Sequence, residues 1–364
     1  MTPLFLNGRF FSQAITGVQR FAIETTAAID RLMDAGEWPD TTILAPRPES
    51  PGRAGDGVPP YRKLRLHAVG RTRGQTWEQM ELPIAARGGT LINLGNTGPV
   101  LFGARQVVVI HDAGVFDTPE SYSLQFRLWY RAVQHRLTSV GVKVVTVSKF
   151  ACRRISECLD LDPSGIDVMY EGADHILRVP ADAGTLQRHG LSPGKFALVV
   201  GAGAAHKNIA AMTEAADLLT RHGIVLAIAG ASDSSMVFRA DCGQKLPGRR
   251  LGRVTDNELR ALYESALCLL FPSRYEGFGL PPVEAMACGC PVIASRGGAV
   301  EEVCSSAALY FTAQEPESLV RAIEQILWEP DLASNLRERG IARAAAFSWD
   351  ASARVLSGVV RQMQ

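Results

Sequence analysis

The sequence predicts an α/β protein with two domains, each built on a parallel sheet that helices cover on both faces. Short apolar runs alternate with segments of helical length along the chain, as in strands joined by helical crossovers. Two runs, residues 106–110 and 143–147, are rich in β-branched residues and bounded by polar or turn residues, which is typical of strands buried on both faces. The chain has 364 residues, and at ~150 residues per domain this length also favours two domains.

In the first half of the chain, a long loop interrupts the predicted strands and helices. Residues 45–60 contain five prolines and three glycines, which is typical of a loop. The predicted strands are residues 3–6, 42–44, 106–110 and 143–147, and the predicted helices are residues 18–33 and 121–137.

The second half repeats the alternation after a linker at residues 178–194, which contains two prolines and three glycines. Two doubly wound domains usually face each other across a cleft and bind ligands at the carboxyl ends of their strands. The predicted strands are residues 195–200, 224–229, 267–271 and 291–294; the predicted helices are residues 208–220, 258–266, 282–288 and 347–364, the last with Trp349 near its start.

Composition and charge exclude several classes of protein. The chain has 38 basic and 37 acidic residues and a formal net charge of +1, so it lacks the basic excess expected of a nucleic-acid-binding protein. Its seven cysteines include no C-x-x-C pair, and we expect buried thiols in a reducing cytoplasm. No apolar run approaches the ~18 residues of a membrane span, and the start lacks the basic region of a signal peptide. We therefore expect a soluble, cytoplasmic protein.

The most informative stretch is a glycine-bearing loop at residues 271–292. Gly277 and Gly279 allow the backbone to approach a ligand closely, and a proline pair then opens a helix. Backbone N–H groups at such a helix start favour an anion such as phosphate. Glu276 and Glu284 bracket the loop, and carboxylates accept hydrogen bonds from sugar hydroxyls, so the combination suits a nucleotide sugar. On spacing alone, Glu284 could instead complement the helix dipole and Glu276 could be a surface residue.

Polar residues follow other predicted strands, where doubly wound domains place their sites. Lys207 lies at a strand-to-helix turn, His111 and Asp112 follow a strong strand, and Gly17 precedes a helix. Plain structural interpretations are also available. Lys207 could be an exposed lysine at a helix start, His111 a core histidine whose hydrogen bonds are satisfied within the protein, and Gly17 an ordinary turn residue. Taken by itself, the stretch at residues 251–259 is best interpreted as an ordinary loop in which Thr255 or Asp256 would cap the next helix.

The string from Glu276 to Val292 decides between these interpretations. It reads Glu-Gly-Phe-Gly-Leu-Pro-x-x-Glu-Ala-Met-Ala-x-Gly-x-Pro-Val and resembles the E-x7-E signature of the retaining GT-B glycosyltransferases of family GT4. The resemblance is strong over residues 196–312, moderate over 1–30 and 91–150, and poor over 45–75. It implies two facing Rossmann-like domains, at residues 1–177 on the acceptor side and 190–346 for the nucleotide sugar. The C-terminal crossover helix, residues 347–364, is expected to pack back on the first domain.

The resemblance also implies a role for particular residues. Glu276, Lys207 and His111 would be catalytic: Glu276 would hold sugar hydroxyls, Lys207 would stabilise charge on the leaving diphosphate, and His111 would lie near the donor sugar. Family members commonly carry arginine where this chain has His206, so either His206 or Arg274 could supply the second positive charge. Further donor-binding residues would be Glu284 at the ribose, Phe278, Gly279 and Leu280 through their amides, Arg253 and Val254 near the base, and Gly17; acceptor-side residues would be Asn93, Asn96, Thr97 and Asp112.

The implied function is transfer of a sugar, with retention, from a nucleotide donor to a glycan or a polyprenyl-diphosphate-linked oligosaccharide. GDP-mannose is the favoured donor and a UDP-sugar the second choice; neither metal nor cofactor is expected. Peripheral contact with the inner membrane would use the face around Trp129 and Tyr130, although we favour a core aromatic stripe there. The alternatives are an NAD-dependent oxidoreductase and a catalytically silent GT-B partner subunit. The D-x-D at residues 160–162, a form found in metal-dependent GT-A enzymes, is interpreted as a surface coincidence.

Overall fold

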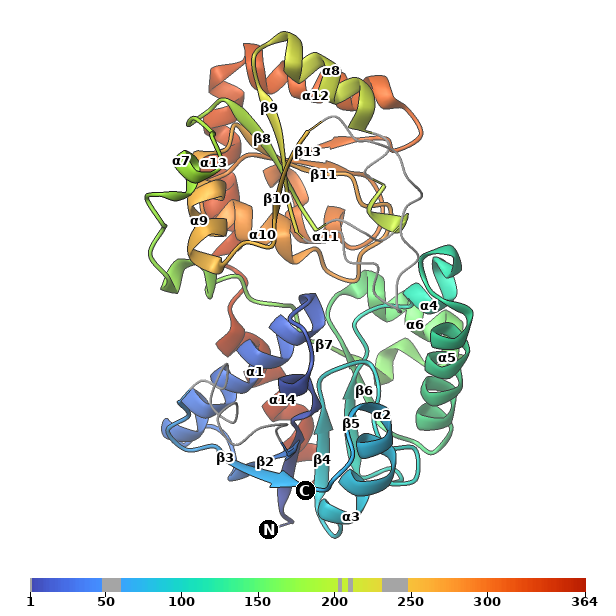
Figure 1. The fold of residues 1–364 in the computed structure, drawn as a ribbon. Coiled ribbons are helices and arrows are strands. Elements are labelled where there is room, and N and C mark those ends of the chain that lie inside the picture. Colours follow the sequence, from blue (N-terminus) through green and yellow to red (C-terminus); the bar gives the residue numbers. More distant parts are fainter. Residues whose placement is uncertain (1, 48–59, 202–204, 209–211, 231–247) are drawn as a thin grey trace. The chain divides into compact units, whose positions relative to one another are not determined.

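The computed structural model describes residues 2–47, 60–201, 205–208, 212–230 and 248–364. They form two compact units (Figure 1). Unit 1 comprises Met1–Ala113, Leu128–Gly172 and Trp349–Gln364, and unit 2 comprises Gly114–Arg127 and Ala173–Ser348. Residues 114–127, which the sequence places in the first domain, group with unit 2, where Ser121 Oγ accepts a hydrogen bond from the backbone N–H of His206 at 3.2 Å.

Unit 1 is built on a seven-stranded sheet in the order β3-β2-β1-β4-β5-β6-β7, with every pair of neighbours parallel. The chain moves outward in one direction from β1 and then in the other from β4, so the topological switch point lies between these two strands. The strands are β1 (Leu4–Asn7), β2 (Thr41–Pro46), β3 (Arg65–Val69), β4 (Thr90–Asn93), β5 (Gln106–Val109), β6 (Lys143–Thr146) and β7 (Asp167–Val168).

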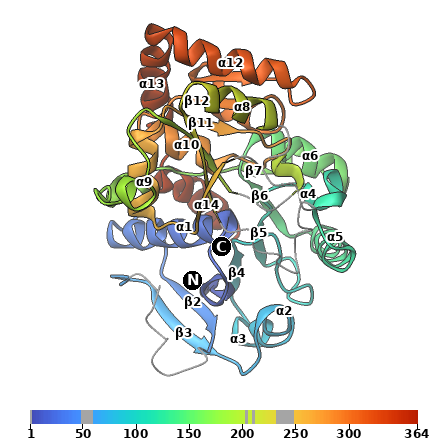
Figure 2. The ribbon, with the colours of Figure 1, turned by 45° about the horizontal axis from the view of Figure 1, so that its top comes forward.

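The helices of unit 1 include the last helix of the chain. Helix α14 (Trp349–Gln362) lies beside α1 (Gly17–Asp34) (Figure 2). The fully buried Trp349 ring meets the edge of Phe21 with centroids 5.8 Å apart, and Arg31 pairs with Asp350. The other helical segments are η1 (Arg9–Ser12), α2 (Gly74–Thr76), the π-helical η2 (Trp77–Glu81), α3 (Leu82–Ala85), most of α5 (Leu124–Ser139), α6 (Lys149–Leu159) and η4 (Pro163–Gly165).

Unit 2 carries a six-stranded, all-parallel sheet in the order β10-β9-β8-β11-β12-β13. Its switch point lies between β8 (Phe196–Val200) and β11 (Cys268–Phe271). The other strands are β9 (Val225–Ala229), β10 (Arg249–Gly252), β12 (Val292–Ser295) and β13 (Ala308–Phe311). The helical segments are α4 (Gly114–Asp117), η3 (Pro119–Ser121), η5 (Ile176–Arg178), α7 (Thr185–Arg188), η6 (Ala205–Lys207), α8 (Thr213–Arg221), α9 (Asp256–Ser265), α10 (Leu280–Ala287), α11 (Val300–Cys304), η8 (Ser305–Ala307), α12 (Pro316–Trp328) and α13 (Pro330–Ala344).

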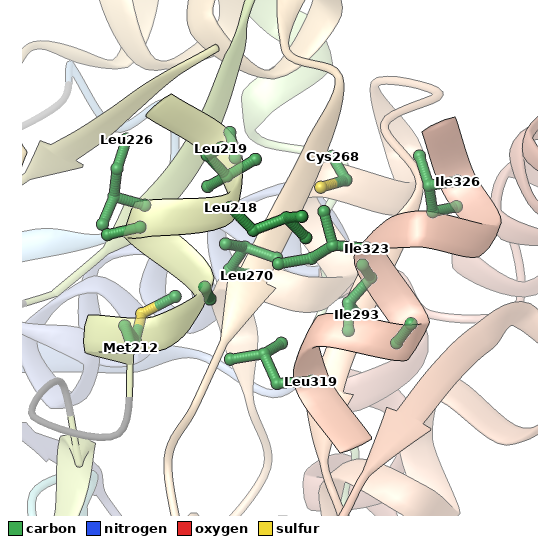
Figure 3. Packing of buried hydrophobic residues seen from close by; sticks show 14 of the residues in the cluster. Met212, Leu218, Leu219, Leu226, Cys268, Leu270, Ile293, Leu319, Ile323 and Ile326 are labelled. Carbon is green, nitrogen blue, oxygen red and sulfur yellow. The ribbon is translucent and has the colours of Figure 1, made fainter. Parts of the chain in front are cut away.

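One face of the unit 2 sheet is covered by α8 and α12, whose apolar sides meet in a common core (Figure 3). Both helices are amphipathic, and burial of their apolar sides supplies most of the stability of such helices. Because this core fixes the strands, the loops at their carboxyl ends are held on a rigid base. The residues labelled in the figure are Met212, Leu218, Leu219, Leu226, Cys268, Leu270, Ile293, Leu319, Ile323 and Ile326.

Several elements differ from the sequence predictions. The predicted helix at 121–137 is the short η3 followed by α5, because extended backbone at Tyr122 ends the first turn. Helix α8 begins at Thr213, and residues 209–211 of the predicted helix lie outside the described residues. Three short strands were not predicted. Strand β3 is largely exposed, β7 has only two residues, and β10 contains two arginines. Strands β4 and β13 and helices α6, α12 and α13 were also not predicted.

The cysteines and the membrane question can be addressed within the described part of the chain. No disulfide joins the six cysteines there, and burial raises the pKa of Cys268 and Cys304 to about 12. Cys242 lies outside the described residues. No described helix is long and apolar enough to cross a membrane.

Candidate functional site

The candidate site in unit 2 lies at the carboxyl edge of the sheet, at its switch point. The chain leaves β8 through Gly201 and reaches Lys207 in η6, and it leaves the neighbouring strand β11 through a loop that carries Glu276. Because parallel strands end at the same edge, two segments that are far apart in sequence meet here. Open α/β sheets bind their ligands at this position.

Lys207 and Glu276 form an ion pair at this edge. Lys207 Nζ lies 2.6 Å from Glu276 Oε1, and the side chains are 21% and 16% exposed. The ammonium also lies 5.4 Å from the centre of the Phe271 ring, within the range of a cation–π contact. Burial by itself would raise the pKa of Glu276, but the neighbouring Lys207 charge outweighs it and the net pKa is lowered. Glu276 is therefore an ionised acceptor at neutral pH.

Glycines allow the backbone to pack tightly around this pair. Gly298 has φ +65°, and a Cβ there would lie 3.1 Å from the backbone N of Glu276. Gly279 has φ +98° and caps α10, and a Cβ there would lie 3.2 Å from Val300 Cγ2. Such torsions are costly for any residue with a side chain. The loop geometry around Glu276 thus depends on both glycines.

His206, next to Lys207, is buried and its pKa is lowered to about 4, chiefly because burial disfavours the charged form. Its backbone carbonyl accepts a hydrogen bond from the Arg274 N–H at 2.9 Å, which joins the two loops. His206 is therefore neutral at pH 7. Of the two residues considered for a second positive charge, only the exposed Arg274 carries one there.

Glu284 lies inside unit 2 and its carboxylate is held by two other side chains. His175 Nε2 lies 2.9 Å from Oε1, and the Tyr263 hydroxyl donates to Oε2 at 2.9 Å. The relative exposure of Glu284 is only 6%. The carboxylate is thus fixed in one orientation, one turn into α10.

Three of the expected donor-binding residues form the start of α10 and its preceding loop. Phe278 and Leu280 are buried, and the Phe278 ring meets Phe347 edge-on at 5.6 Å. Prolines 281 and 282 carry no N–H, so among the first amides of this helix only those of Gly279 and Leu280 can face an anion. The helix start is therefore a narrower anion site than an ordinary helix would offer.

Arg253 and Val254 follow β10 at the same edge of the sheet, with Arg253 exposed and Val254 half-buried. The next residue, Thr255, caps α9 through a reciprocal capping box with Glu258, so the structural interpretation of Thr255 is confirmed. The placement of Arg253 and Val254 leaves their contact with a base a proposal.

In unit 1, His111 follows β5 and is 4% exposed. Its Nε2 lies 2.9 Å from the carbonyl oxygen of Leu94, its Nδ1 lies 3.5 Å from Glu171 Oε1, and its backbone N–H donates to Asn96 Oδ1 at 2.7 Å. A carbonyl oxygen only accepts, so the proton is on Nε2. Glu171 is itself 6% exposed, and the pair forms a buried contact between the ends of β5 and β7.

Asn93 and Thr97, expected on the acceptor side, are part of a buried polar network at the unit 1 switch point. Asn7, at the end of β1, donates from Nδ2 to Asn93 Oδ1 at 2.9 Å and to Glu78 Oε1 at 2.8 Å. Thr97 Oγ1 donates to Glu78 Oε2 at 2.8 Å and accepts from Arg9 at 3.0 Å. Asn93 and Thr97 are 0% and 1% exposed. Their side chains therefore support the loops at this edge and do not line its surface.

The remaining predicted residues lie nearer the surface. Gly17 is the exposed first residue of α1, with no atom within 4 Å of the position of a Cβ. Asp112 is half-buried beside His111. In the D-x-D pair, Asp160 ends α6 in the left-handed conformation and Asp162 caps η4, so both have local structural roles. Within the described ranges, no group of three or more His, Cys, Asp or Glu side chains is arranged to hold a metal ion.

Sequence reasoning missed His175, Tyr263 and Ser121, and Glu171 was not among its predicted site residues. Tyr263 reads as an ordinary core aromatic on an amphipathic helix, and Ser121 was placed inside a helix. Glu171 lies in the segment Tyr-Glu-Gly-Ala-Asp at residues 170–174, and His175 follows that segment directly. Their burial and their contacts with His111 and Glu284 distinguish these two residues from surface polar residues.

Comparisons with known proteins show which family this sequence resembles. The family described as "Glycosyl transferases group 1" matches residues 186–343, which include Lys207, Glu276 and Glu284. Over 256 residues, 68% of this chain and 67% of the relative, the sequence is 30% identical to O-antigen chain mannosyltransferase B of Escherichia coli. It is 28% identical over 334 residues to O-antigen chain mannosyltransferase RfbU of Salmonella typhimurium, covering 88% of this chain and 89% of the relative.

Solved structures support the fold. Sucrose-phosphate synthase from Thermosynechococcus elongatus superposes with a TM-score of 0.71 at 20% identity, covering 100% of this chain and 99% of that chain. WaaG, a glycosyltransferase involved in lipopolysaccharide biosynthesis, gives a TM-score of 0.69 at 13% identity, covering 98% and 99%. Both have the GT-B fold of paired parallel-sheet domains that the sequence predicts. The chain therefore belongs to the glycosyl transferases group 1 family and is a glycosyltransferase with the GT-B fold.

Proposed function

We propose that this glycosyltransferase moves mannose, with retention of configuration, from GDP-mannose to a glycan or a lipid-linked saccharide. The observation that carries the proposal is the ion pair of Lys207 and Glu276 at the switch point of the unit 2 sheet. A fixed cation and an ionised carboxylate, side by side at a ligand-binding edge, suit a substrate that presents a diphosphate next to a hydroxyl-rich ring.

Each residue then has a chemical task. Lys207, with Arg274 as the second cation, stabilises the negative charge that develops on the departing diphosphate. Glu276 accepts hydrogen bonds from sugar hydroxyls, and Glu284 accepts from the ribose. His111 is proposed to contact the donor sugar. In the transfer, the bond from C1 of the sugar to the phosphate oxygen breaks and the bond from C1 to the acceptor oxygen forms on the same face, while the acceptor proton goes to the departing phosphate.

The choice of mannose rests on the relatives. Two relatives that cover two thirds or more of this chain are O-antigen chain mannosyltransferases. A UDP-sugar remains the second choice of donor. The family assignment leaves the NAD-dependent oxidoreductase alternative without support, whereas a catalytically silent partner subunit would share the fold and is distinguished only by experiment.

A lipid-linked acceptor would bring the enzyme to the cytoplasmic face of a membrane, and α5 has the chemistry for peripheral contact. The favoured prediction of a core aromatic stripe is wrong for Trp129, which is 39% exposed, whereas Tyr130 is half-buried. Leu124 and Leu128 are 54% and 57% exposed. Helix α5 contains no acidic residue. An apolar face flanked by arginines suits a surface of anionic lipid. The arginines are Arg127, Arg131 and Arg136.

Thermal shift in EDTA, followed by a transfer assay, tests the proposal. GDP, UDP, ADP, GDP-mannose, UDP-glucose, UDP-N-acetylglucosamine and NAD are compared, each near 100 times its dissociation constant where known. A ligand at that level adds ~2.7 kcal/mol, which corresponds to several degrees at ~2–4 °C per kcal/mol. We expect stabilisation by GDP and GDP-mannose in the absence of metal, and release of GDP when an O-antigen-type acceptor is added.

Other outcomes contradict particular parts of the proposal. If only UDP and one UDP-sugar raise the melting temperature, the proposed donor is wrong, but the proposed transferase activity stands. Stabilisation that appears only after Mg²⁺ is added contradicts metal independence. Binding of GDP-mannose without transfer to any acceptor, and with full retention of the bound donor, favours the silent partner subunit.

A further inference from the structure

The carboxylate of Glu284 is held from both sides by side chains that the family signature does not include. His175, the residue before η5, meets Oε1 through Nε2 at 2.9 Å, and Tyr263, on α9, donates to Oε2 at 2.9 Å. The side chains of His175 and Glu284 are 3% and 7% exposed, and Tyr263 is fully buried. Two separate segments, the one before η5 and α9, therefore meet at a carboxyl group that a third element, α10, carries.

The direction of both hydrogen bonds is fixed by chemistry. Burial and the neighbouring Glu284 charge raise the pKa of Tyr263 well above its ordinary value, so its phenol keeps its proton and donates. An ionised carboxylate only accepts, so His175 carries its proton on Nε2. The terminal torsion of a glutamate is broad and roughly two-fold, and one donor on each oxygen removes that freedom.

We propose that His175 and Tyr263 are positioning residues that hold the Glu284 carboxylate at the angle needed to accept both hydroxyls of a ribose. This inference rests on the proposed contact of Glu284 with the ribose and adds the origin of its selectivity. A carboxylate offers about four acceptor positions, so bonds from His175 and Tyr263 orient it without using them up. Its two oxygens match the two hydroxyls of a vicinal diol only in a fixed orientation.

The consequence is a preference for ribonucleotides over 2′-deoxyribonucleotides. A deoxyribose offers one donor in place of two, so a fixed carboxylate loses a charge-assisted hydrogen bond to it. A carboxylate that turns freely would discriminate less strongly between ribose and 2′-deoxyribose. A purely structural role for His175 and Tyr263 predicts a different result, because loss of stability would weaken the binding of both nucleotides alike.

Calorimetric titration of the full-length chain with GDP and with 2′-deoxy-GDP tests the proposal. We expect the wild type to bind GDP roughly tenfold or more tightly than 2′-deoxy-GDP. In Tyr263→Phe and His175→Ala, GDP affinity should fall roughly tenfold while 2′-deoxy-GDP affinity stays within about twofold, so the ratio collapses. His175→Gln, which keeps an N–H donor, should restore part of the ratio.

Two control variants separate the possible failures. Tyr310→Phe removes a hydroxyl that donates to the Ser305 carbonyl at 2.6 Å elsewhere in unit 2, and it should leave the ratio unchanged. A lowered melting temperature in Tyr263→Phe and His175→Ala with an unchanged ratio overturns the positioning role alone. An unchanged ratio in Glu284→Gln overturns the ribose contact and this inference with it. Absence of binding of any nucleoside diphosphate to the wild type overturns the proposed function as well.

Discussion

Lys207 Nζ lies 2.6 Å from Oε1 of Glu276, although 69 residues separate them in sequence. The two residues follow β8 and β11, neighbours in the sheet that are not consecutive in the chain. The ion pair keeps Glu276 ionised and holds Lys207 at the switch point. A diphosphate that binds Lys207 therefore competes with the Glu276 carboxylate for the same ammonium group. The carboxylate can then accept hydrogen bonds from the sugar hydroxyls instead.

Lys207→Ala should reduce kcat by roughly 10²- to 10³-fold, the usual effect of removing one preorganised electrostatic stabiliser. The melting temperature should also fall by several degrees, because the largely buried Glu276 carboxylate loses the cation that stabilises its charge. Lys143→Ala is the matched control, since Lys143 Nζ lies 2.7 Å from Asp167 Oδ2 in unit 1, away from the proposed chemistry. Equal losses of activity in the two variants would contradict the assignment of Lys207.

The stability of unit 2 should fall as the pH is lowered from about 6.5 to 4 because of His206. Its folded-state pKa of about 4 lies below the unfolded value, so the unfolded chain binds the proton first and acid favours unfolding. The loss is roughly 3 kcal/mol when complete. The free energy of unfolding of the wild type, measured by urea titration at each pH, should therefore fall relative to that of His206→Gln as the pH is lowered over this range. A difference in unfolding free energy that does not change with pH, or NMR spectra that show His206 protonated at pH 6, would contradict this prediction.

His111→Ala and Glu171→Gln should lower kcat non-additively. Their side chains are 3.5 Å apart and both are buried, so each variant removes the same contact. We expect Glu171→Gln to cost roughly tenfold in kcat and to have little further effect in a His111→Ala background. Additive losses in this double-mutant cycle would show that Glu171 does not act through His111.

Gly298→Ala should lower both stability and activity. The new Cβ would lie 3.1 Å from the backbone N of Glu276, in addition to the strain of φ +65°. Gly141→Ala is the control, because Gly141 has φ +77° and no atom within 4 Å of a Cβ. Strain alone costs about 1–2 kcal/mol, so both variants should be destabilised by that amount. Only Gly298→Ala should also lose kcat; an unchanged kcat would mean that the Glu276 loop tolerates the shift.

Replacement of Leu128 and Trp129 by serine should weaken binding to vesicles that contain anionic lipid, measured by co-sedimentation. A fall of roughly tenfold or more is expected, since each large apolar side chain contributes on the order of 1.5–3 kcal/mol when fully buried. Trp328→Ser, which removes a tryptophan that is 67% exposed on α12, is the matched control and should bind as the wild type does. Equal binding by all three proteins would exclude α5 as the membrane contact.

The sequence alone determined the elements whose cause is local. The proline pair at 281 and 282 and the glycines before it fix a strand–loop–helix unit, and the structure has β11, the loop and α10 there. The β-branched runs at residues 106–110 and 143–147 became β5 and β6. In both cases the torsional preferences of neighbouring residues decide the conformation, so a window of a few residues contains the information.

Only the tertiary structure decided which side chains act together. The order of strands places Lys207 on Glu276, and His175, 109 residues from Glu284 in sequence, lies on the carboxylate of that residue. The folded structure also buries Asn93 and Thr97 in a polar network and leaves Trp129 exposed. A helical sequence pattern cannot distinguish such an exposed tryptophan from a core aromatic. Sequence neighbours fix backbone torsions, but contacts between distant segments depend on sheet order and packing, and these form only when the whole chain has folded.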